Sequence, residues 1–512
     1  MKYFILVLGM ITLLGCSQDE QENRPNIIFI MTDDHASSAI SAYGSPYLKT
    51  TNIDQLANEG MLFKKAFVTN SICAPSRAVI LTGKYSHLNS VPDNESPFDT
   101  AQLTFPKLFR EHGYQTAIVG KWHLKSQPQG FDYWNILPGQ GLYYNPVFID
   151  NGKDTTYQGY VTDIITEKTL EWLEQRDRDK PFLLMMHHKA PHRNWMPALR
   201  HLDEFEEGFS DLADTYFDDY AGRAHLKQQT LTVADHMSLA YDLKIQCDTC
   251  TEAPINKWTP GAYQHRLSRL SDEQLSQWNA GYQKEREAFS AFEDHDSRAF
   301  KEWKLKRYLQ DYLRCILSVD ESIGAVNQYL KSAGLADNTV VVYTSDQGFF
   351  LGEHGLFDKR YMYEESFQTP LLMKFPALIE AGSKSEQLVM NLDLAPTFLD
   401  LADIAIPPSM QGRSLMPLLS DSQPDDWREA VYYQFYEDAF GVPQHYGIRT
   451  GRYKLIRFDT EPVSWELYDL KKDPDEMNNL YADPAYQPIV TDLKSKLQEL
   501  RAQYQIETSP RQ

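Results

Sequence analysis

Two of the apolar segments in this sequence end in side chains that could bind a cation. Asp33 and Asp34 follow the first continuous apolar run, and Asp346 and Gln347 follow the last one. Such runs are typical of buried parallel strands, and ligand groups in these sheets gather at the carboxyl ends of the strands. Neighbouring carboxylates at that position are costly unless a cation joins them, and oxygen ligands suit a hard cation. The sequence therefore predicts a cation site.

A candidate nucleophile lies in the segment 71–78. Cys73 is followed by Pro75 two residues later and by Arg77 four residues later. A cysteine in this setting is either a nucleophile or a buried structural thiol beside a turn-forming proline. Taken alone, the pattern does not decide between the two readings.

The elements that must position these residues alternate between strand and helix. Four segments are predicted as core strands: 24–34, 113–120, 181–188 and 339–344. Three segments have helical periodicity: 51–59, 105–111 and 304–335. This alternation indicates an α/β sandwich.

The last part of the chain has a different pattern. Short antiparallel strands are predicted at 430–435, 447–450, 453–458 and 465–470, followed by an amphipathic helix at 489–504. We therefore divide the chain into a main domain at 24–420 and a small C-terminal subdomain of sheet plus helix at 421–512. Residues from about 199 to 297 are charged and helical in pattern, which indicates an insertion into the main domain.

Residues 1–23 resemble a bacterial lipoprotein signal peptide with a polar, acidic tether. Lys2 precedes an apolar stretch, too short for a transmembrane helix, that ends in Leu13-Leu14-Gly15-Cys16. The resemblance implies cleavage before Cys16 and lipidation of that residue. The lipid would anchor the protein to a membrane facing the periplasm, or to the outer membrane at the cell surface. The alternative is a plain secretory signal with a chance cysteine.

The composition limits the kinds of partner. The chain has 512 residues, of which 42% are hydrophobic and 12% aromatic, as in an ordinary globular protein. Its net charge of −21 argues against a nucleic-acid partner, because phosphate binding needs a basic surface. An anionic substrate must be held by a local positive cluster against this field. In an exported protein, Cys247 and Cys250 are expected to form a local disulfide.

The segment around Cys73 resembles the Cys-x-Pro-Ser-Arg signature of the type I sulfatase family, within the alkaline phosphatase superfamily. Four further stretches match this family in chain order: Asp33-Asp34, 113–123, 188–192 and 345–359. Five matching pieces in order make coincidence improbable. The resemblance implies an alkaline-phosphatase-like α/β fold, in which helices sandwich a large mixed central sheet, and the hydrolysis of sulfate esters.

In this family the cysteine, here Cys73, is oxidised to formylglycine by a formylglycine-generating or an anaerobic sulfatase-maturating enzyme. The resemblance implies that one hydroxyl of the hydrated aldehyde attacks sulfur and that the second hydroxyl then releases sulfate. It also implies a calcium ion bound by Asp33, Asp34, Asp346, Gln347 and the modified Cys73, with Asp346 helping to activate the attacking hydroxyl. The family often has asparagine at the position of Gln347, and an amide oxygen serves in either case.

The resemblance assigns roles to five further residues. Arg77 would hold the hydrated aldehyde in place. Lys121, His192 and Lys359 would neutralise the sulfate oxygens as charge builds on them. His192 and Lys359 would also assist the departing alcohol oxygen, and His123 would help the hemiacetal to collapse.

The substrate is indicated less directly. Candidates for a sugar subsite are His87, Asn194, Trp195, His445 and Arg449. Each is equally consistent with a structural role, because loop composition is weak evidence. Segments 130–146 and 445–450 resemble bacterial N-acetylglucosamine-6-sulfatases and mucin-desulfating enzymes. Similar sulfatases act on algal polysaccharides such as ulvan, so the expected substrate is a sulfated polysaccharide or its oligosaccharides.

Two other functions fit parts of this pattern. Phosphomonoesterases and phosphonate hydrolases of the same superfamily share the metal-binding pair, but the full Cys-x-Pro-Ser-Arg context favours sulfate. A non-catalytic surface lipoprotein that binds glycans would keep the fold without the chemistry. Loss of function usually removes at least one of Lys121, His192 and Lys359, and all three are present.

Overall fold

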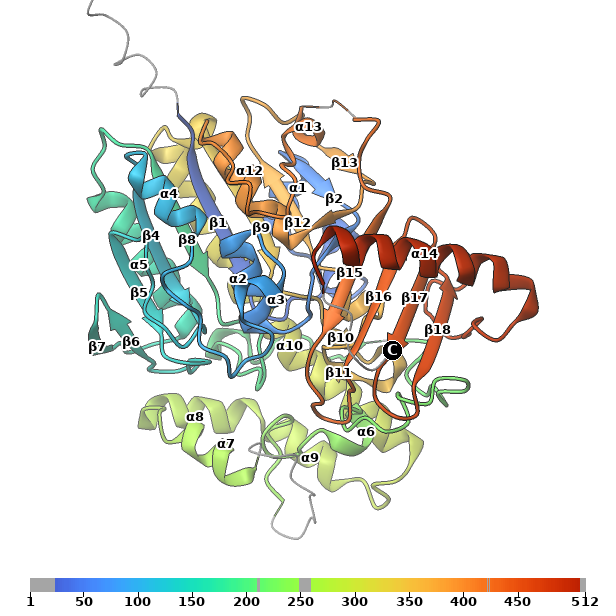
Figure 1. The fold of residues 1–512 in the computed structure, drawn as a ribbon. Coiled ribbons are helices and arrows are strands. Elements are labelled where there is room, and N and C mark those ends of the chain that lie inside the picture. Colours follow the sequence, from blue (N-terminus) through green and yellow to red (C-terminus); the bar gives the residue numbers. More distant parts are fainter. Residues whose placement is uncertain (1–23, 210–211, 248–258, 421, 423, 507–512) are drawn as a thin grey trace, which may run out of the picture.

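A ten-stranded mixed sheet runs through the main domain (Figure 1). The computed structural model describes residues 24–209, 212–247, 259–420, 422 and 424–506. The central strand of the sheet, β1 (Asn26–Thr32), pairs in parallel with β8 (Phe182–His187) and β9 (Thr339–Ser345). The order across the sheet is β13 (Ser383–Ser385), β2 (Met61–Phe63), β12 (Leu371–Lys374), β9, β1, β8, β4 (Gln115–Lys121), β5 (Tyr133–Leu137), β6 (Val147–Asp150) and β7 (Lys153–Thr156).

Side chains of β1 alternate between two hydrophobic cores, one on each face of the sheet. Ile28 and Ile30 belong to one core, whereas Ile27, Phe29 and Met31 belong to the other. This alternation follows from the two-residue repeat of a strand, and burial on both faces explains the continuous apolar run. The predicted α/β fold with a mixed central sheet is confirmed.

Helices cover both faces of this sheet (Figure 1). One face is covered by α1 (Thr51–Asn58), α5 (Val161–Gln175) and α10 (Arg298–Ser332). The other face is covered by α2 (Cys73–Thr82), α4 (Phe105–Glu111) and α12 (Leu394–Leu401). The main domain is therefore a helix–sheet–helix sandwich.

Helix α10 differs from its prediction at both ends, since it begins at Arg298 and ends at Ser332. Its start is fixed by Ser297, whose side chain accepts a hydrogen bond from the backbone N–H of Phe300. Gly334 follows the helix with a φ of 67°, a left-handed conformation that glycine adopts at low cost. The sequence analysis missed the N-terminal cap because the first turns of the helix are strongly charged.

The described residues of the segment 199–297 are helical or irregular, and none of them lies in a strand. The helices are α6 (Val233–His236), α7 (Pro260–Leu267), α8 (Asp272–Gly281) and α9 (Gln283–Ser290). They lie on the side of the sheet toward which β1 runs, which is the edge that carries the predicted cation site (Figure 1).

The C-terminal subdomain is a four-stranded antiparallel sheet with one long helix (Figure 1). Its elements are β15 (Ala430–Phe435), β16 (His445–Thr450), β17 (Tyr453–Phe458), β18 (Ser464–Asp469) and α14 (Gln487–Gln503). The predicted sheet-plus-helix arrangement is confirmed, although β16 begins before the predicted residue 447 because His445 pairs with Phe435 and Phe458.

Predictions about the N-terminus fall on residues 1–23, including Cys16, and lie outside the described residues. Cys250 also lies outside them, whereas Cys247 is disulfide-bonded. Among the helices that the structure describes, none combines the length and the hydropathy that a membrane span requires.

Buried carboxyl groups lie where the C-terminal sheet meets the main domain. Lys454 Nζ is 2.8 Å from Glu364 Oε1 and 2.8 Å from Glu476 Oε1. Burial raises the pKa of Glu476 to about 7 and that of Glu365 to about 8, although Lys454 opposes the shift at Glu476. Folding therefore favours the protonated form of both acids.

We expect this interface to weaken in alkaline solution. An acid whose pKa is raised on folding loses stabilisation as the pH rises from its unfolded value of about 4.5 toward its folded value. Between pH 6 and pH 9 the melting temperature should fall less in Glu365→Gln than in the wild type, because glutamine resembles the protonated acid. Equal falls in both proteins would contradict this prediction, and Glu386→Gln at the exposed surface serves as the control.

Candidate active site

Strands β1 and β9 bring three carboxylates together at the carboxyl edge of the sheet. Their register pairs Thr32 with Ser345, so the residues that follow the two strands are neighbours. Asp33, Asp34 and Asp346 each offer an oxygen within 4.8 Å of the others. The backbone N–H of Asp34 donates to Asp346 Oδ1 at 3.2 Å. All three side chains are buried, as the sequence analysis expected for a cation site.

The oxygens of this cluster are not satisfied by the protein alone. Asp33 Oδ1 and Gln347 Oε1 are buried and accept no hydrogen bond from the part of the chain that the structure describes. Burial raises the pKa of Asp34 to about 6 against the charge of Lys359, and burial together with Asp33 raises that of Asp346 to about 7. The unpaired oxygens and the raised pKa values of the two acids both fit a site that binds a positive charge. The set of oxygen donors suits a hard divalent cation.

Cys73 lies beside this cluster as the first residue of α2. Its Sγ is 3.2 Å from Lys359 Nζ, which also donates a hydrogen bond to Asp34 Oδ1. Burial raises the pKa of the Cys73 thiol to about 12, so the unmodified side chain is a neutral thiol near pH 7 and a poor nucleophile. The position is right for a nucleophile, but the encoded group is not activated.

Arg77 lies one helical turn after Cys73, on the same face of α2. Its Nε and Nη2 atoms donate to Asp346 Oδ2 at 3.0 and 2.8 Å, and its Nη1 donates to the backbone oxygen of Lys121 at 2.8 Å. This forked contact joins α2 to the ends of β9 and β4. The Cys-x-Pro-Ser-Arg spacing thus fixes Cys73 relative to the carboxylates.

Lys121 ends β4 and donates to Asp33 Oδ2. Although burial opposes ionisation, the charges of Lys121 and Arg77 hold the pKa of Asp33 well below its usual range. Lys121 Nζ also donates to Gln140 Oε1 at 2.5 Å. The ammonium group is therefore fixed from two sides.

His192 faces the cluster after β8. Its Nδ1 is 2.7 Å from the backbone oxygen of Arg193, which can only accept, so Nδ1 carries the proton. Nε2 lies 3.8 Å from Asp34 Oδ2. Burial lowers the pKa of His192 well below its usual range, although Asp33 opposes the shift. The neutral ring thus presents the lone pair of Nε2 to the cluster.

His123 adjoins the cluster without a hydrogen bond to it among the described residues. Its pKa is well below the usual range because of burial and the charge of Lys121. Its φ is 57° and that of Asp34 is 70°, and a left-handed conformation is costly for residues other than glycine. Such backbone strain is often found at functional sites.

The predicted catalytic and metal-binding residues therefore come together. The cluster comprises Asp33, Asp34, Cys73, Arg77, Lys121, His192, Asp346, Gln347 and Lys359, with His123 beside it. The individual roles assigned to these residues remain predictions.

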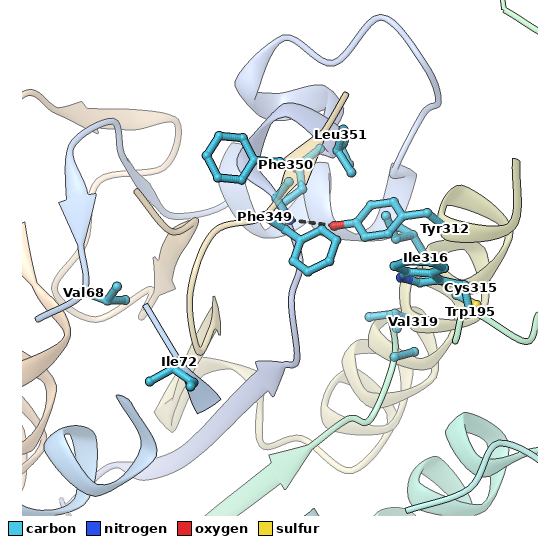
Figure 2. Packing of buried hydrophobic residues seen from close by; sticks show 14 of the residues in the cluster. Val68, Ile72, Trp195, Tyr312, Cys315, Ile316, Val319, Phe349, Phe350 and Leu351 are labelled. Atoms are coloured by element: carbon cyan, nitrogen blue, oxygen red, sulfur yellow. Dashed lines mark hydrogen bonds between the residues drawn. The ribbon is translucent and has the colours of Figure 1, made fainter. Parts of the chain in front are cut away.

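The predicted sugar-subsite residues each have packing or hydrogen-bond partners of their own. Trp195 is fully buried and packs on Tyr308 and Phe349 in the hydrophobic core (Figure 2). His445 is likewise buried, and its ring lies against Phe435 among other aromatic rings. The role of these two side chains in sugar binding remains a prediction that their packing does not support.

The other three candidates have structural contacts of their own. His87 Nε2 is 2.9 Å from the backbone oxygen of Tyr504, and Arg449 Nη2 is 3.1 Å from Glu364 Oε2. The side-chain amide of Asn194 donates to the backbone oxygen of Tyr241 at 3.2 Å. Asn194 also lines a small cavity close to the cluster.

Sequence reasoning missed Gln140 and the pair Asp358 and Arg360. Gln140 lies in a segment whose resemblance was noticed, but nothing in the sequence indicated its contact with Lys121. Asp358 and Arg360 flank Lys359, pair with one another, and both have left-handed φ values, of 80° and 94°. In the sequence, only their position next to Lys359 indicated that they belong to the site.

The site as a whole defines a class of enzyme. It combines a carboxylate cluster suited to a divalent cation with buried lysines and an arginine around one potential nucleophile. Such a site is built to hold an anionic ester and to stabilise the charge that develops when the ester is cleaved. The fold and the site thus indicate a hydrolase of sulfate or phosphate esters.

Comparison with known families decides between these esters. The sulfatase family model matches residues 25–404, and the model of the N-sulphoglucosamine sulphohydrolase C-terminal region matches residues 352–503. The chain belongs to the sulfatase family, and it is a sulfuric ester hydrolase.

Three relatives are informative. An N-acetylglucosamine-6-O-sulfatase of Bacteroides thetaiotaomicron is 46% identical over 98% of this chain and 90% of its own length. A solved structure in complex with its substrate D-glucosamine-2-N,6-O-disulfate is also 46% identical, with a TM-score of 0.90 over 94% of this chain and 98% of the other. An ulvan-active sulfatase of Formosa agariphila is 26% identical over 96% of this chain and 85% of its own length.

We expect Lys359→Ala to lower kcat by about 10²- to 10³-fold, the typical cost of removing one group that stabilises developing charge. Lys359 contacts both Cys73 and Asp34, so its replacement removes one positive charge from the surroundings of the nucleophile. Steady-state kinetics on a sulfated saccharide measure this effect. Lys64→Ala, at an exposed ion pair with Glu386, should leave kcat unchanged. Equal activities of the two variants would contradict the assignment.

Proposed function

We propose that this protein removes the 6-O-sulfate group from glucosamine residues of sulfated glycans, with a calcium ion and a formylglycine made from Cys73. The observation that carries the proposal is the full-length similarity to an N-acetylglucosamine-6-O-sulfatase, at 46% identity. The complete cluster around Cys73 supports it, because no expected catalytic side chain is replaced.

Asp33, Asp34, Asp346 and Gln347 would hold the calcium ion, and the unpaired oxygens of Asp33 and Gln347 are suited to this role. When present, the two groups supply a hydrated aldehyde as nucleophile and a Lewis acid at the sulfate oxygens. The high pKa of the Cys73 thiol supports the modification, because the encoded side chain is not ionised near pH 7.

The protein's own side chains bind the ester and move protons. Lys121 is held by Asp33 and Lys359 by Asp34, and the ammonium groups of both lysines are available to bind the sulfate. His192, with its proton on Nδ1, has a lone pair at Nε2, which must first take up a proton before that atom can donate one to the leaving alcohol oxygen. These fixed dipoles and charges require no rearrangement as negative charge develops.

Residues 1–23 support a proposal about location. We propose that the chain is exported and lipidated at Cys16, because Leu13-Leu14-Gly15-Cys16 ends a short apolar stretch of signal-peptide type. Mass analysis of the N-terminal peptide of the natural protein should show a lipid on Cys16. A mature N-terminus at another residue would contradict the proposal.

Release of inorganic sulfate from N-acetylglucosamine-6-sulfate tests the activity. We expect kcat/KM for this saccharide to exceed that for its 3-sulfated isomer by more than about tenfold. A site that binds a sulfate group at one position of the sugar discriminates strongly against an isomer whose sulfate lies elsewhere. Ulvan oligosaccharides and a phosphonate monoester serve as competing substrates. Faster cleavage of either one would overturn the proposal, and tight glycan binding without sulfate release would favour a non-catalytic protein.

A further inference from the structure

A small cavity beside the candidate active site is lined by three basic side chains. Lys189 follows β8, whereas Arg266 belongs to α7 and Arg269 follows that helix in the insertion. Asn194 and Tyr143 also line the cavity, whose volume is about 10 Å³, room for about one water molecule. The cavity is therefore formed where the insertion, visible as α7 in Figure 1, meets the carboxyl edge of the sheet.

These three cations differ from their neighbours because no acidic partner is found for them in the part of the chain that the structure describes. Arg193 pairs with Asp242 at 2.5 Å, and Lys244 pairs with Asp311 at 3.3 Å. Those ion pairs neutralise the charge that the insertion buries against the main domain. Within the described residues, by contrast, none of the three cations that line the cavity forms an ion pair with a carboxylate.

Among the described residues, the contacts that these cations make are with groups that carry no net charge. Lys189 Nζ donates to the backbone oxygen of Gln140 at 3.0 Å and lies 4.7 Å from the ring centre of Tyr143. Arg269 Nη2 donates to the backbone oxygen of Asn145 at 2.5 Å, and its Nε is buried without a hydrogen-bond partner among the described residues. Carbonyl oxygens and ring faces satisfy donors but carry no net charge.

Arg266 completes the group from a half-buried position. Its guanidinium lies 5.0 Å from the ring centre of Tyr241. Burial and the charge of Lys121 lower the pKa of Lys189 to about 7, and Arg266 acts in the same direction. An anion between these groups would relieve the repulsion that their proximity creates.

Gln140 connects the cavity to the candidate active site. Its backbone oxygen accepts from Lys189, and its side-chain oxygen accepts from Lys121, which faces the sulfate position. One residue therefore separates the two positive groups. Both lysines contact the same residue, Gln140. A saccharide whose sulfate lies at Lys121 can therefore place a second anionic group near Lys189.

We propose that Lys189, Arg266 and Arg269 form a second anion subsite, which takes a further sulfate or carboxylate group of the saccharide whose 6-sulfate is cleaved. The inference rests on the proposed function and makes it more specific, since it selects glycans with more than one anionic group. The cavity as it stands has room for no more than a water molecule, so the half-buried side chain of Arg266 must move outward to admit even a small oxyanion, and a sugar ring is excluded.

The test compares substrates that differ in their second anion. The probes are N-acetylglucosamine-6-sulfate, glucosamine-2-N,6-O-disulfate, and a disaccharide in which a uronic acid is attached to 6-sulfated N-acetylglucosamine. In the wild type we expect kcat/KM for at least one dianionic probe to exceed that for the monosulfated probe by about tenfold, the effect of one charge-assisted hydrogen bond. Which probe gains distinguishes a sulfate from a carboxylate.

Arg266→Gln and Arg269→Gln should each bring this ratio toward one. Arg286→Gln makes the same chemical change on α9 of the insertion and should keep the wild-type ratio. Equal kcat/KM for all probes in the wild type, or an unchanged ratio in both subsite variants, would overturn the subsite and leave the proposed function standing. If the wild type cleaves none of the probes, the proposed function itself fails.

Discussion

Replacing Cys73 with alanine is expected to lower kcat/KM by about 10⁴-fold or more, because the reaction loses its nucleophile. Cys73 is the first residue of α2 and lies beside the cluster, with Lys359 Nζ 3.2 Å from its sulfur. No other group in the described part of the site is placed to take over its role. Initial rates of sulfate release at saturating calcium measure the loss.

The matched control for this variant is Cys315→Ala. Cys315 is also a free, buried cysteine, but it lies in α10 within the hydrophobic core (Figure 2). Its replacement should cost some stability and leave kcat unchanged. The intact mass of the active wild type should show an aldehyde at position 73. Full activity in Cys73→Ala, or in protein whose Cys73 is wholly unmodified, would show that the proposed chemistry is wrong.

Removing the divalent cation is expected to lower kcat/KM by about 10²-fold or more, since the cation supplies charge where the ester binds. Without it, the charges of Asp33, Asp34 and Asp346 offset those of the basic side chains around them, and little attraction for sulfate remains. Treatment with a chelator followed by titration with calcium should abolish and then restore the activity.

A second measurement of this effect does not depend on activity. Calcium at about 100 times its Kd should stabilise the folded protein by about 2.7 kcal/mol and so raise its melting temperature by several degrees. Asp34→Asn should reduce this rise, whereas Asp154→Asn at an exposed position should not. A melting temperature that calcium leaves unchanged in the wild type would refute the metal site.

The carboxylate cluster could be predicted because its members directly follow strands. Asp33 and Asp346 come after apolar runs, and a run buried on both faces is recognisable from the sequence alone. Once both runs belong to one parallel sheet, their carboxyl ends must meet at the same edge. Cys73 and Arg77 could be placed for a similar local reason, since four residues make one turn of α2.

The surroundings of the predicted sugar-subsite residues could not be predicted, because burial is not a local property. Trp195 and His445 are of types that often contact sugars, yet both are enclosed by aromatic rings from distant parts of the chain. Whether such a side chain faces solvent or a core depends on which elements pack over it. The spacing of residues within a loop does not indicate whether a side chain in it will be buried.

The sequence by itself determined the strand-end carboxylates and the Cys-x-Pro-Ser-Arg turn, because each depends on neighbours within one turn or one strand. The class of chemistry was implied by the resemblance of these pieces, in chain order, to the sulfatase family. Only the tertiary structure decided that Gln140 joins Lys121 to Lys189, and that Arg266 and Arg269 approach Lys189 without an acidic partner among the described residues. These side chains are distant in the chain and meet only because the insertion packs over the carboxyl edge of the sheet. Charge balance at a site depends on every group in reach, so it is fixed only when the chain has folded.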